Sequence, residues 1–525
     1  MEEVENGPWI FRHGTTVSQF ERETFKYIGC HQQEDDTVKF KLKPYAHQLK
    51  ALEACKIHDD YALLWEMGTG KTGAMINVLR YQYGRRKRIL KTLILGPLAV
   101  VKNWEREFEI HSWVPQDKIY ALNKAGSKRN KLVNEICQKD DGILVLNYQA
   151  LTRKETVDAI LKWKPEVLVC DESHMLKNHQ SKTAKTVYKL SMSCLHRYIL
   201  TGTPILNSEL DIFQQYKILD GGNTFGMVFN RFRSEYFIND NAHNPHVSWP
   251  KWIPNPYKDV QSDISQMMYR KASRIKKELC LDLPPLVKQT YEVQMSPEQA
   301  RAYKEMKQHY ITWIESKDSG PRDKEGKLQP VVAQLAVTKL LRLQQIISGY
   351  VKTDVGEEVP FSKNPRLKAL EELVESLVKD HKIIIWCSFK CDYKVIDKML
   401  THLKIYELNQ EFEHVFLTGE QTGGQKQDAI DRFQRDPKTK IIVANRASGG
   451  TGVNLTQAAY SIVYSRDFSL ANELQSEARN HRGGSEIHER ITKIDLVTPD
   501  TVDSQVLEAL KQKKNISDVI LDIRP

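Results

Sequence analysis

The chain has 525 residues, with 77 Lys and Arg against 67 Asp and Glu, so its formal net charge is +10. Its hydrophobic fraction of 40% is that of an ordinary globular protein. No apolar run approaches the roughly 18 to 20 residues that cross a bilayer, which excludes an integral membrane protein. The mild basic excess suits a polyanionic partner, although many proteins that bind none share it.

The first residues, MEEVENGP, contain neither the basic region nor the apolar core of a signal peptide. The eight cysteines form no CxxC pair, so neither a disulfide framework nor a zinc site is expected. His243 and His246 are not accompanied by a further Cys or His cluster, so we expect no metal there. The sequence therefore predicts a cytoplasmic protein.

Short β-branched runs alternate along the chain with longer segments of helical period. The predicted strands are 61–64, 92–95, 142–146, 167–170, 197–200, 382–386, 440–443 and 461–464. Strands that alternate with helices at these distances predict parallel sheets covered on both faces. The fold class is therefore α/β, with two tandem lobes.

The strand signals divide the chain into five parts. We expect an N-terminal extension at 1–39, a first lobe at 40–220, a mainly helical insertion and connection at 221–355, a second lobe at 356–500, and a C-terminal helix at 501–525 that closes the second lobe. Helical patterns in the insertion cover 260–278, 297–315 and 331–347. Residues 316–327 contain no apolar side chain and predict a surface loop.

A glycine loop follows the first predicted strand. Gly68-Thr69-Gly70-Lys71-Thr72 stands between that strand and a helical pattern, the order that a phosphate-binding loop requires. Backbone N–H groups at the start of the helix would cradle phosphate oxygens, Lys71 would place its charge against the terminal phosphates, and the Thr72 hydroxyl would ligate Mg²⁺. The alternative is a flexible turn that carries a lysine.

Two carboxylates follow the strand predicted at 167–170. Asp171 and Glu172 stand at its carboxyl end, where α/β sheets place their ligands. Asp171 can hold Mg²⁺, usually through water, and Glu172 can orient and deprotonate the attacking water. Adjacent acidic residues are common by chance, but together with Lys71 and Thr72 they predict a nucleoside triphosphatase.

Further motifs follow in an order that carries a specific resemblance. The segments are 45–48 (YAHQ), 66–72 (EMGTGKT), Pro97 with Asn103, Trp104, Glu107 and Phe108, 171–174 (DESH), 200–207 (LTGTPILN), 274–284 (RIKKELCLDLP), 296–303 (SPEQARAY), 449–456 (GGTGVNLT) and 475–485 (QSEARNHRGGS). From about residue 40 almost to the C-terminus, the chain resembles the Swi/Snf-type ATPases of helicase superfamily two. The resemblance implies two RecA-like lobes that use ATP and Mg²⁺. Its compactness is similar to that of the stand-alone members of phages and bacteria.

The resemblance assigns further residues to the nucleotide. Gln48 would read the adenine edge, and Gly452 would lie beside the nucleotide. Arg479 and Arg482 would reach the γ-phosphate as arginine fingers. Because they are three positions apart, they would share one face if their segment is helical.

Thr201, Thr203 and Gln475 are implied to couple the nucleotide site to a nucleic-acid groove.

Three departures mark a divergent member of the family. Ala447 stands where the family has an arginine, with Arg446 one position earlier. Phe468 to Leu470 replaces Trp-Asn-Pro, and Gly483 to Ser485 replaces Ile-Gly-Gln.

The expected partner is DNA, most simply double-stranded and bound through its phosphates without sequence preference. Candidate contacts are Lys102, Asn103, Tyr148, Ser388, Gly449, Gly450 and Thr451. The basic cluster 85–88 is read as a solvated loop, and the cluster 270–277 as a helix beside the groove. The favoured function is an ATP-dependent translocase on double-stranded DNA. The alternatives are a strand-separating DNA or RNA helicase and a nucleotide-gated, non-catalytic clamp.

Overall fold

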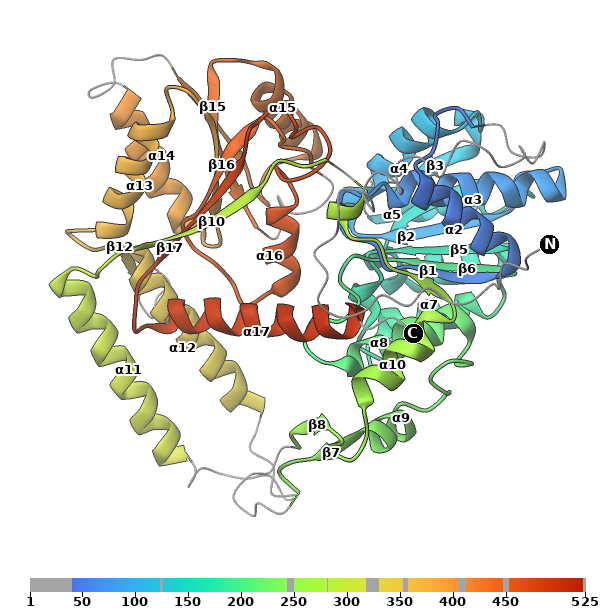
Figure 1. Ribbon diagram of the computed structural model, residues 1–525, viewed down its shortest axis with the longest axis horizontal. Coiled ribbons are helices and arrows are strands. Elements are labelled where there is room, and N and C mark those ends of the chain that lie inside the picture. Colours follow the sequence, from blue (N-terminus) through green and yellow to red (C-terminus); the bar gives the residue numbers. More distant parts are fainter. Residues whose placement is uncertain are drawn as a thin grey trace, which may run out of the picture. The chain divides into compact units, whose positions relative to one another are not determined.

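The computed structural model describes residues 40–122, 126–242, 250–280, 282–317, 330–352, 357–404, 412–446 and 453–522. The chain divides into two compact units. The first comprises Met1–Ile238, Ile253–Asp282 and Lys513–Pro525, and the second comprises Asn239–Trp252 and Leu283–Gln512. Each unit is built around one parallel sheet flanked by helices (Figure 1). This confirms the predicted α/β class with two lobes.

The first sheet has the strand order β3-β4-β2-β5-β6-β1-β9, and every neighbouring pair is parallel. Its strands are β1 (Asp60–Leu63), β2 (Thr92–Gly96), β3 (Ile119–Ala121), β4 (Ile143–Asn147), β5 (Val167–Asp171), β6 (His196–Leu200) and β9 (Ala272–Ser273). Every residue of β1, β2, β4 and β5 is buried, as expected for strands covered on both faces.

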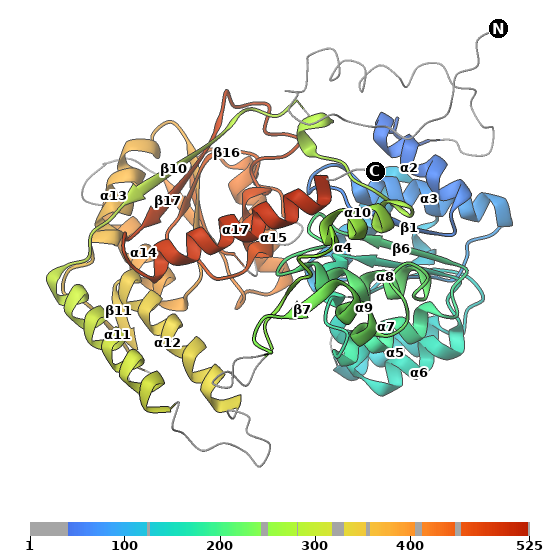
Figure 2. The ribbon, with the colours of Figure 1, turned by 60° about the horizontal axis from the view of Figure 1, so that its bottom comes forward.

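The helices of the first unit cover both faces of this sheet. They are α2 (Ala46–Ile57), α3 (Lys71–Arg86), α4 (Leu98–His111), α5 (Gly126–Ile136), α6 (Lys154–Trp163), α7 (Lys182–Ser191), α8 (Ile212–Asp220), α9 (Phe229–Tyr236) and α10 (Val260–Tyr269). Figure 2 shows α2 and α3 on one side of β1 and β6, with α5, α6 and α7 on the other.

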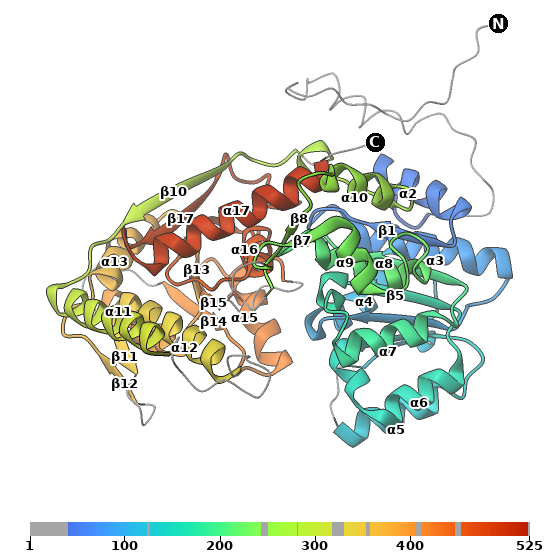
Figure 3. The ribbon, with the colours of Figure 1, turned by 90° about the horizontal axis from the view of Figure 1, so that it is seen from below.

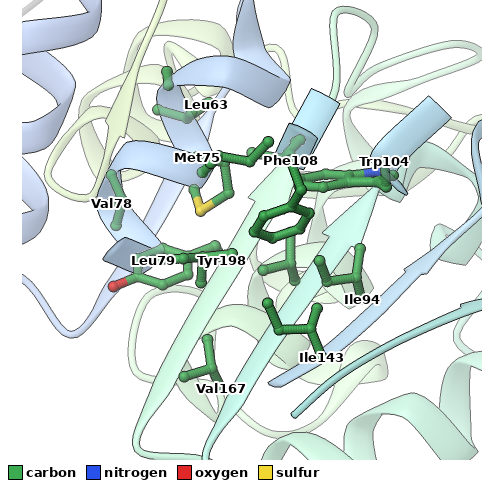
Figure 4. Packing of buried hydrophobic residues seen from close by; sticks show 14 of the residues in the cluster. Leu63, Met75, Val78, Leu79, Ile94, Trp104, Phe108, Ile143, Val167 and Tyr198 are labelled. Carbon is green, nitrogen blue, oxygen red and sulfur yellow. The ribbon is translucent and has the colours of Figure 1, made fainter. Parts of the chain in front are cut away.

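One core cluster fixes the helix that carries the glycine loop. Met75, Val78 and Leu79 of α3 pack with Trp104 and Phe108 of α4 over the strand residues Leu63, Ile94, Ile143, Val167 and Tyr198 (Figure 4). The fully buried indole of Trp104 lies in this layer. The cluster therefore sets the position of α3 relative to the carboxyl ends of β1 and β5.

The second sheet has the order β10-β17-β16-β13-β15-β14, again with parallel neighbours. Its strands are β10 (Leu286–Glu292), β13 (Lys382–Cys387), β14 (Glu413–Leu417), β15 (Thr439–Asn445), β16 (Ala458–Val463) and β17 (Ile491–Val497). Side chains of β13 alternate between two cores: Ile383 and Ile385 enter one, and Ile384 and Trp386 enter the other.

The remaining elements lie around this sheet or form hairpins. They are α11 (Pro297–Lys317), α12 (Pro330–Ser348), α13 (Pro365–Leu377), α14 (Lys390–His402), α15 (Gly423–Arg435), α16 (Leu470–Glu477) and α17 (Val502–Asp522), with the short strand pairs β7 (Phe237–Asn239) with β8 (Trp252–Pro254) and β11 (Tyr350–Lys352) with β12 (Glu358–Pro360). In Figure 3, α11 and α12 lie side by side, and these two helices pack against each other.

All eight predicted strands are present, but five strands of the two sheets were not predicted: β3, β9, β10, β14 and β17. The helix predicted over 260–278 is wrong in its second half, because α10 ends at Tyr269 and β9 then joins the first sheet. Since β9 and β10 belong to different sheets, we propose that the chain passes from the first lobe to the second near residue 283, so the expected insertion and connection at 221–355 is divided between the two units. The expected extension at 1–39 and the histidines His243 and His246 lie outside the described residues.

No helix in the described part of the chain is both long and apolar enough to cross a membrane. In the same part, no cluster of three or more His, Cys, Asp or Glu side chains could hold a metal ion.

Candidate nucleotide site

The glycine loop joins the end of β1 to the start of α3. Gly68 and Gly70 have φ angles of +85° and +79°, in the left-handed region that glycine adopts without strain. Gly70 is also the residue that precedes the first turn of α3. A Cβ at Gly70 would lie 2.6 Å from Nε2 of Gln48, so close packing gives a second reason for glycine.

Helix α2 holds this loop through two adjacent side chains. A ring nitrogen of His47 lies 2.8 Å from the carbonyl oxygen of Thr69, and Nε2 of Gln48 donates to the carbonyl oxygen of Gly70 at 3.0 Å. The Tyr45 N–H donates in turn to Oε1 of Gln48. Gln48 therefore contacts the loop itself, and its reading of adenine stays a prediction. His47 was not singled out from the sequence, although it stands in the matching segment 45–48.

Lys71 lies at the first position of α3 and points back toward the loop. Its Nζ donates to the carbonyl oxygens of Trp65 at 2.8 Å and Glu66 at 3.1 Å. Burial lowers the pKa of the Lys71 amine, and the charges of Glu172 and Asp171 oppose that fall. The structure thus brings Lys71 near both predicted carboxylates, and Thr72 follows it in the first turn of the helix.

Asp171 ends β5 and is 7% exposed. Its Oδ2 accepts from Nε1 of Trp104 and its Oδ1 from the Glu172 N–H, each at 2.9 Å. Burial raises the pKa of Asp171 to about 6, and the neighbouring Glu172 charge adds to the rise. Glu172 itself has a φ of +50°, a conformation that non-glycine residues adopt rarely and often at functional sites.

These side chains fit a magnesium ion better than a metal held by protein alone. Mg²⁺ is usually bound by one or two protein oxygens and completes its shell with phosphate oxygens and water. Asp171 supplies one carboxylate whose orientation is fixed by two hydrogen bonds, and Thr72 supplies a hydroxyl. A nearby divalent cation would favour the charged form of a carboxyl whose pKa is raised to about 6.

A chain of polar contacts runs from Glu172 to the TGTP segment. Oε2 of Glu172 lies 3.3 Å from Nδ1 of His174, and this nitrogen lies 3.1 Å from Oγ1 of Thr201. The Thr203 N–H donates to the same hydroxyl at 3.1 Å. Thr201 is fully buried and Thr203 nearly so. The two predicted coupling threonines are therefore in hydrogen-bond contact with the DESH motif.

The family models decide which family this arrangement belongs to. The model described as SNF2-related domain matches residues 56–347, more than half of the chain, and the helicase conserved C-terminal domain matches 365–484. The chain belongs to the SNF2-related, helicase-like ATPases. The predicted resemblance to Swi/Snf-type ATPases is confirmed.

Three similar SNF2-related proteins show the range of the family. The CHD3-type chromatin-remodeling factor PICKLE of Arabidopsis thaliana is 25% identical and covers 93% of this chain and 35% of its own length. The uncharacterized ATP-dependent helicase MG018 of Mycoplasma genitalium is 25% identical, covering 86% of this chain and 39% of its own. The mouse chromodomain-helicase-DNA-binding protein 1-like is 25% identical, and the match covers 87% of this chain and 47% of the mouse protein. The chain thus spans between a third and a half of the length of these relatives.

Among solved structures, the Sulfolobus solfataricus SWI2/SNF2 ATPase core in complex with dsDNA is 23% identical, with a TM-score of 0.41 over 93% of this chain and 94% of that chain. The SWI2/SNF2 ATPase core domain from the same organism is 22% identical, with a TM-score of 0.38 over 91% of each chain.

The arginines predicted as fingers of this SNF2-related ATPase lie in the second unit. Helix α16 ends at Glu477, so Arg479 and Arg482 stand in a turn, and the helical segment that would place them on one face is not formed. Nη1 of Arg479 donates to the carbonyl oxygen of Val453 at 3.1 Å. Gln475 lies on α16 and is buried. Gly452 lies outside the described residues.

The predicted nucleic-acid contacts lie in different settings. Lys102 is exposed and Asn103 half-buried in α4, and the Ser388 N–H donates to Oγ of Ser465 at 2.7 Å. Tyr148 is only 3% exposed, and its hydroxyl donates to the carbonyl oxygen of Asp171 at 2.7 Å. Because its hydroxyl is used inside the lobe, we do not retain Tyr148 as a contact. Gly449, Gly450 and Thr451 lie outside the described residues.

Two basic side chains are buried within the lobes. Arg446, which departs from the family position by one residue, is fully buried and pairs with Glu473, which also pairs with Lys493. The cluster 270–277 was expected as a helix beside the groove, but α10 ends at Tyr269, Lys271 pairs with Asp60, and Arg274 is buried against the glycine loop. The interpretation of the cluster 270–277 as a helix beside the groove fails because sequence spacing does not reveal a buried partner distant in the chain.

Proposed function

We propose that the chain is an ATP-dependent translocase of the Swi/Snf type, which moves along double-stranded DNA and remodels protein–DNA complexes or branched DNA. The observation that carries the proposal is the continuous contact from Glu172 through His174 to Thr201 and Thr203. It connects a nucleotide site to a segment that, in this family, is implied to respond to nucleic acid.

Each residue of the site has a chemical task. The backbone N–H groups of Gly68, Thr69 and Gly70 would bind phosphate oxygens together with the Lys71 amine. Asp171 and Thr72 would hold Mg²⁺, which neutralises charge on the phosphates. Glu172 would orient the attacking water and accept its proton. Arg479 and Arg482 would approach the γ-phosphate from the second lobe.

DNA is the partner that the names of two relatives support. One relative is named as a DNA-binding helicase protein and another as a chromatin-remodeling factor. A protein that tracks along DNA needs contacts to phosphates, since these repeat regardless of sequence. The exposed amine of Lys102 is suited to such a contact, and Asn103 and Ser388 remain candidate polar contacts.

ATP hydrolysis with different nucleic acids tests the proposal. We expect hydrolysis to rise strongly with double-stranded DNA and to fall at least 100-fold in Lys71→Ala and Glu172→Gln, the scale expected when a catalytic group is removed. Equal stimulation by RNA alone would overturn the DNA assignment.

A second assay separates the translocase from the alternatives. Displacement of the third strand from a DNA triplex without unwinding of a forked duplex supports a translocase. Unwinding of the fork supports a strand-separating helicase. Binding that depends on ATP without hydrolysis or displacement supports a non-catalytic clamp, and contradicts the proposal.

A further inference from the structure

The segment 271–277 lies against the phosphate-binding loop of the first unit. Strand β9 pairs in parallel with β1, and the pairing continues beyond the strand. The Leu64 N–H donates to the carbonyl oxygen of Ser273, and the Glu66 N–H donates to that of Ile275, each at 2.9 Å. The stretch Leu283–Gln512, which follows this segment, belongs to the second unit. One covalent connection between the units therefore begins at the loop that would bind phosphate.

Arg274 joins three parts of the nucleotide site with one side chain. It is 5% exposed, and its Nη1 donates to the carbonyl oxygens of Leu64 at 3.1 Å and Gly202 at 3.2 Å. Its Nη2 donates to Oε1 of Glu66 at 3.4 Å. Gly202 belongs to the TGTP segment, and a Cβ there would lie 3.0 Å from the carbonyl oxygen of Trp65. The guanidinium thus fixes two backbone segments that are already in close contact.

Glu66 extends this arrangement to Lys71 and to the connecting segment. Its Oε2 accepts from the Lys277 N–H at 3.1 Å, while Oε1 accepts from Arg274. Its carbonyl oxygen accepts from Nζ of Lys71 at 3.1 Å and from Oγ1 of Thr69 at 2.8 Å. One residue therefore contacts the phosphate-binding lysine through its backbone and the connection to the second unit through its carboxylate.

We propose that Arg274 and Glu66 are positioning residues of the ATP site, which keep the phosphate-binding loop, the TGTP segment and the connection to the second unit in one fixed arrangement. This inference rests on the proposed ATP hydrolysis. The planar guanidinium donates to three acceptors in different directions, which a lysine amine on a flexible stem cannot reproduce. Without these hydrogen bonds, Lys71 is displaced relative to Asp171, and DNA stimulates ATP hydrolysis less.

Three variants test the proposal: Arg274→Lys, Glu66→Gln and the control Lys271→Gln. Lys271 pairs with Asp60 at 3.0 Å near the opposite end of the same β1–β9 pairing, so its loss removes a comparable ion pair away from the loop. Hydrogen exchange in the protein without nucleotide is the first measurement. We expect the amides of Leu64, Glu66 and Lys277 to exchange at least tenfold faster in Arg274→Lys and Glu66→Gln, and at the unaltered rate in Lys271→Gln.

Kinetics give the second measurement. We expect KM for ATP to rise and the factor by which DNA stimulates hydrolysis to fall at least fivefold in both test variants, with both values unchanged in the control. If all three variants changed KM and the DNA stimulation factor equally, the role of Arg274 and Glu66 would be merely structural and the proposal would be overturned. Unaltered hydrogen exchange in the two test variants would also overturn it. If the unaltered protein hydrolyses no ATP but the exchange difference is present, the proposed function fails while the positioning of the loop stands. If Arg274→Lys does not fold, Glu66→Gln decides.

Discussion

The indole Nε1 of Trp104 donates a hydrogen bond of 2.9 Å to Oδ2 of Asp171. Trp104 is fully buried in α4, and Asp171 ends the central strand β5. Burial raises the pKa of Asp171, and the hydrogen bond from the indole opposes that rise because it stabilises the charged carboxylate. The helix that follows β2 therefore sets both the orientation and the charge of the proposed magnesium ligand.

Replacing Trp104 by Phe removes the donor and keeps an aromatic ring in the core. We expect the pKa of Asp171 to rise further, so the acid limb of kcat/KM for ATP moves to higher pH by about one unit. Trp163→Phe is the matched control, because Trp163 is also buried and its Nε1 donates to the carbonyl oxygen of Lys139 at 2.8 Å. Equal pH profiles for Trp104→Phe and the unaltered protein would contradict this role.

The pH dependence of the unaltered enzyme follows from the same carboxyl. With its pKa raised to about 6, Asp171 takes up a proton as the pH falls through that value. The neutral acid binds Mg²⁺ poorly, so we expect kcat/KM to fall about tenfold for each unit of pH below 6. A higher Mg²⁺ concentration competes with the proton and should move the midpoint to lower pH. A steady-state profile that is flat from pH 7.5 to 5 would contradict the raised pKa of Asp171.

Local motifs made most of the nucleotide site predictable. Lys71 and Thr72 follow a strand and begin a helix, and Asp171 and Glu172 follow another strand. Their positions can therefore be predicted from the residues next to them in the sequence. Arg274 and Glu66 are 208 positions apart in the chain, and no local pattern relates them. Tyr148 was predicted as a nucleic-acid contact because it follows a strand, but its hydroxyl turns inward to the carbonyl of Asp171.

The missed strands have a similar explanation. Strand β10 reads LVKQTYE, with five of its seven residues exposed, so its sequence lacks the apolar run that marked the central strands. Strand β17 reads ITKIDLV and is buried throughout, including Lys493 and Asp495. These two charges are accommodated by ion pairs to Glu473 of α16 and to Arg466 in the loop between β16 and α16. A pattern of apolar residues cannot reveal a strand whose polar side chains are paired in the core.

Glycine at position 349 is predicted to be essential for the fold of the second lobe. Its φ is +108°, and a Cβ would lie 1.9 Å from Nδ2 of Asn364, the residue that caps α13. We expect Gly349→Ala to lower the free energy of unfolding by about 2 to 4 kcal/mol. Gly424→Ala is the control, because a Cβ there meets nothing within 4 Å, and it should change stability by less than about 1 kcal/mol. Urea denaturation compares the two variants, and equal midpoints would refute the prediction.

The buried carboxyl of Asp392 makes the stability of the second lobe depend on pH. Asp392 is fully buried at the start of α14, and its Oδ2 accepts from Oγ of Ser465 and the Phe389 N–H. Burial raises its pKa to about 7, whereas these hydrogen bonds oppose the rise. Between about pH 4 and 7 the folded protein holds this proton and the unfolded chain does not, so stability falls as the pH rises through that window.

Replacing Asp392 by Asn removes this titration while keeping the shape of the protonated acid. We expect Asp392→Asn to be more stable than the unaltered protein by about 4 kcal/mol at pH 8, which corresponds to a pKa shift of about three units, and by only about 2 kcal/mol at pH 5, where the window of titration has just begun. Asp428→Asn, at an exposed position of α15, should follow the pH dependence of the unaltered protein. If the difference between Asp392→Asn and the unaltered protein were the same at both pH values, Asp392 would not carry the buried proton, because only a titrating group makes that difference depend on pH.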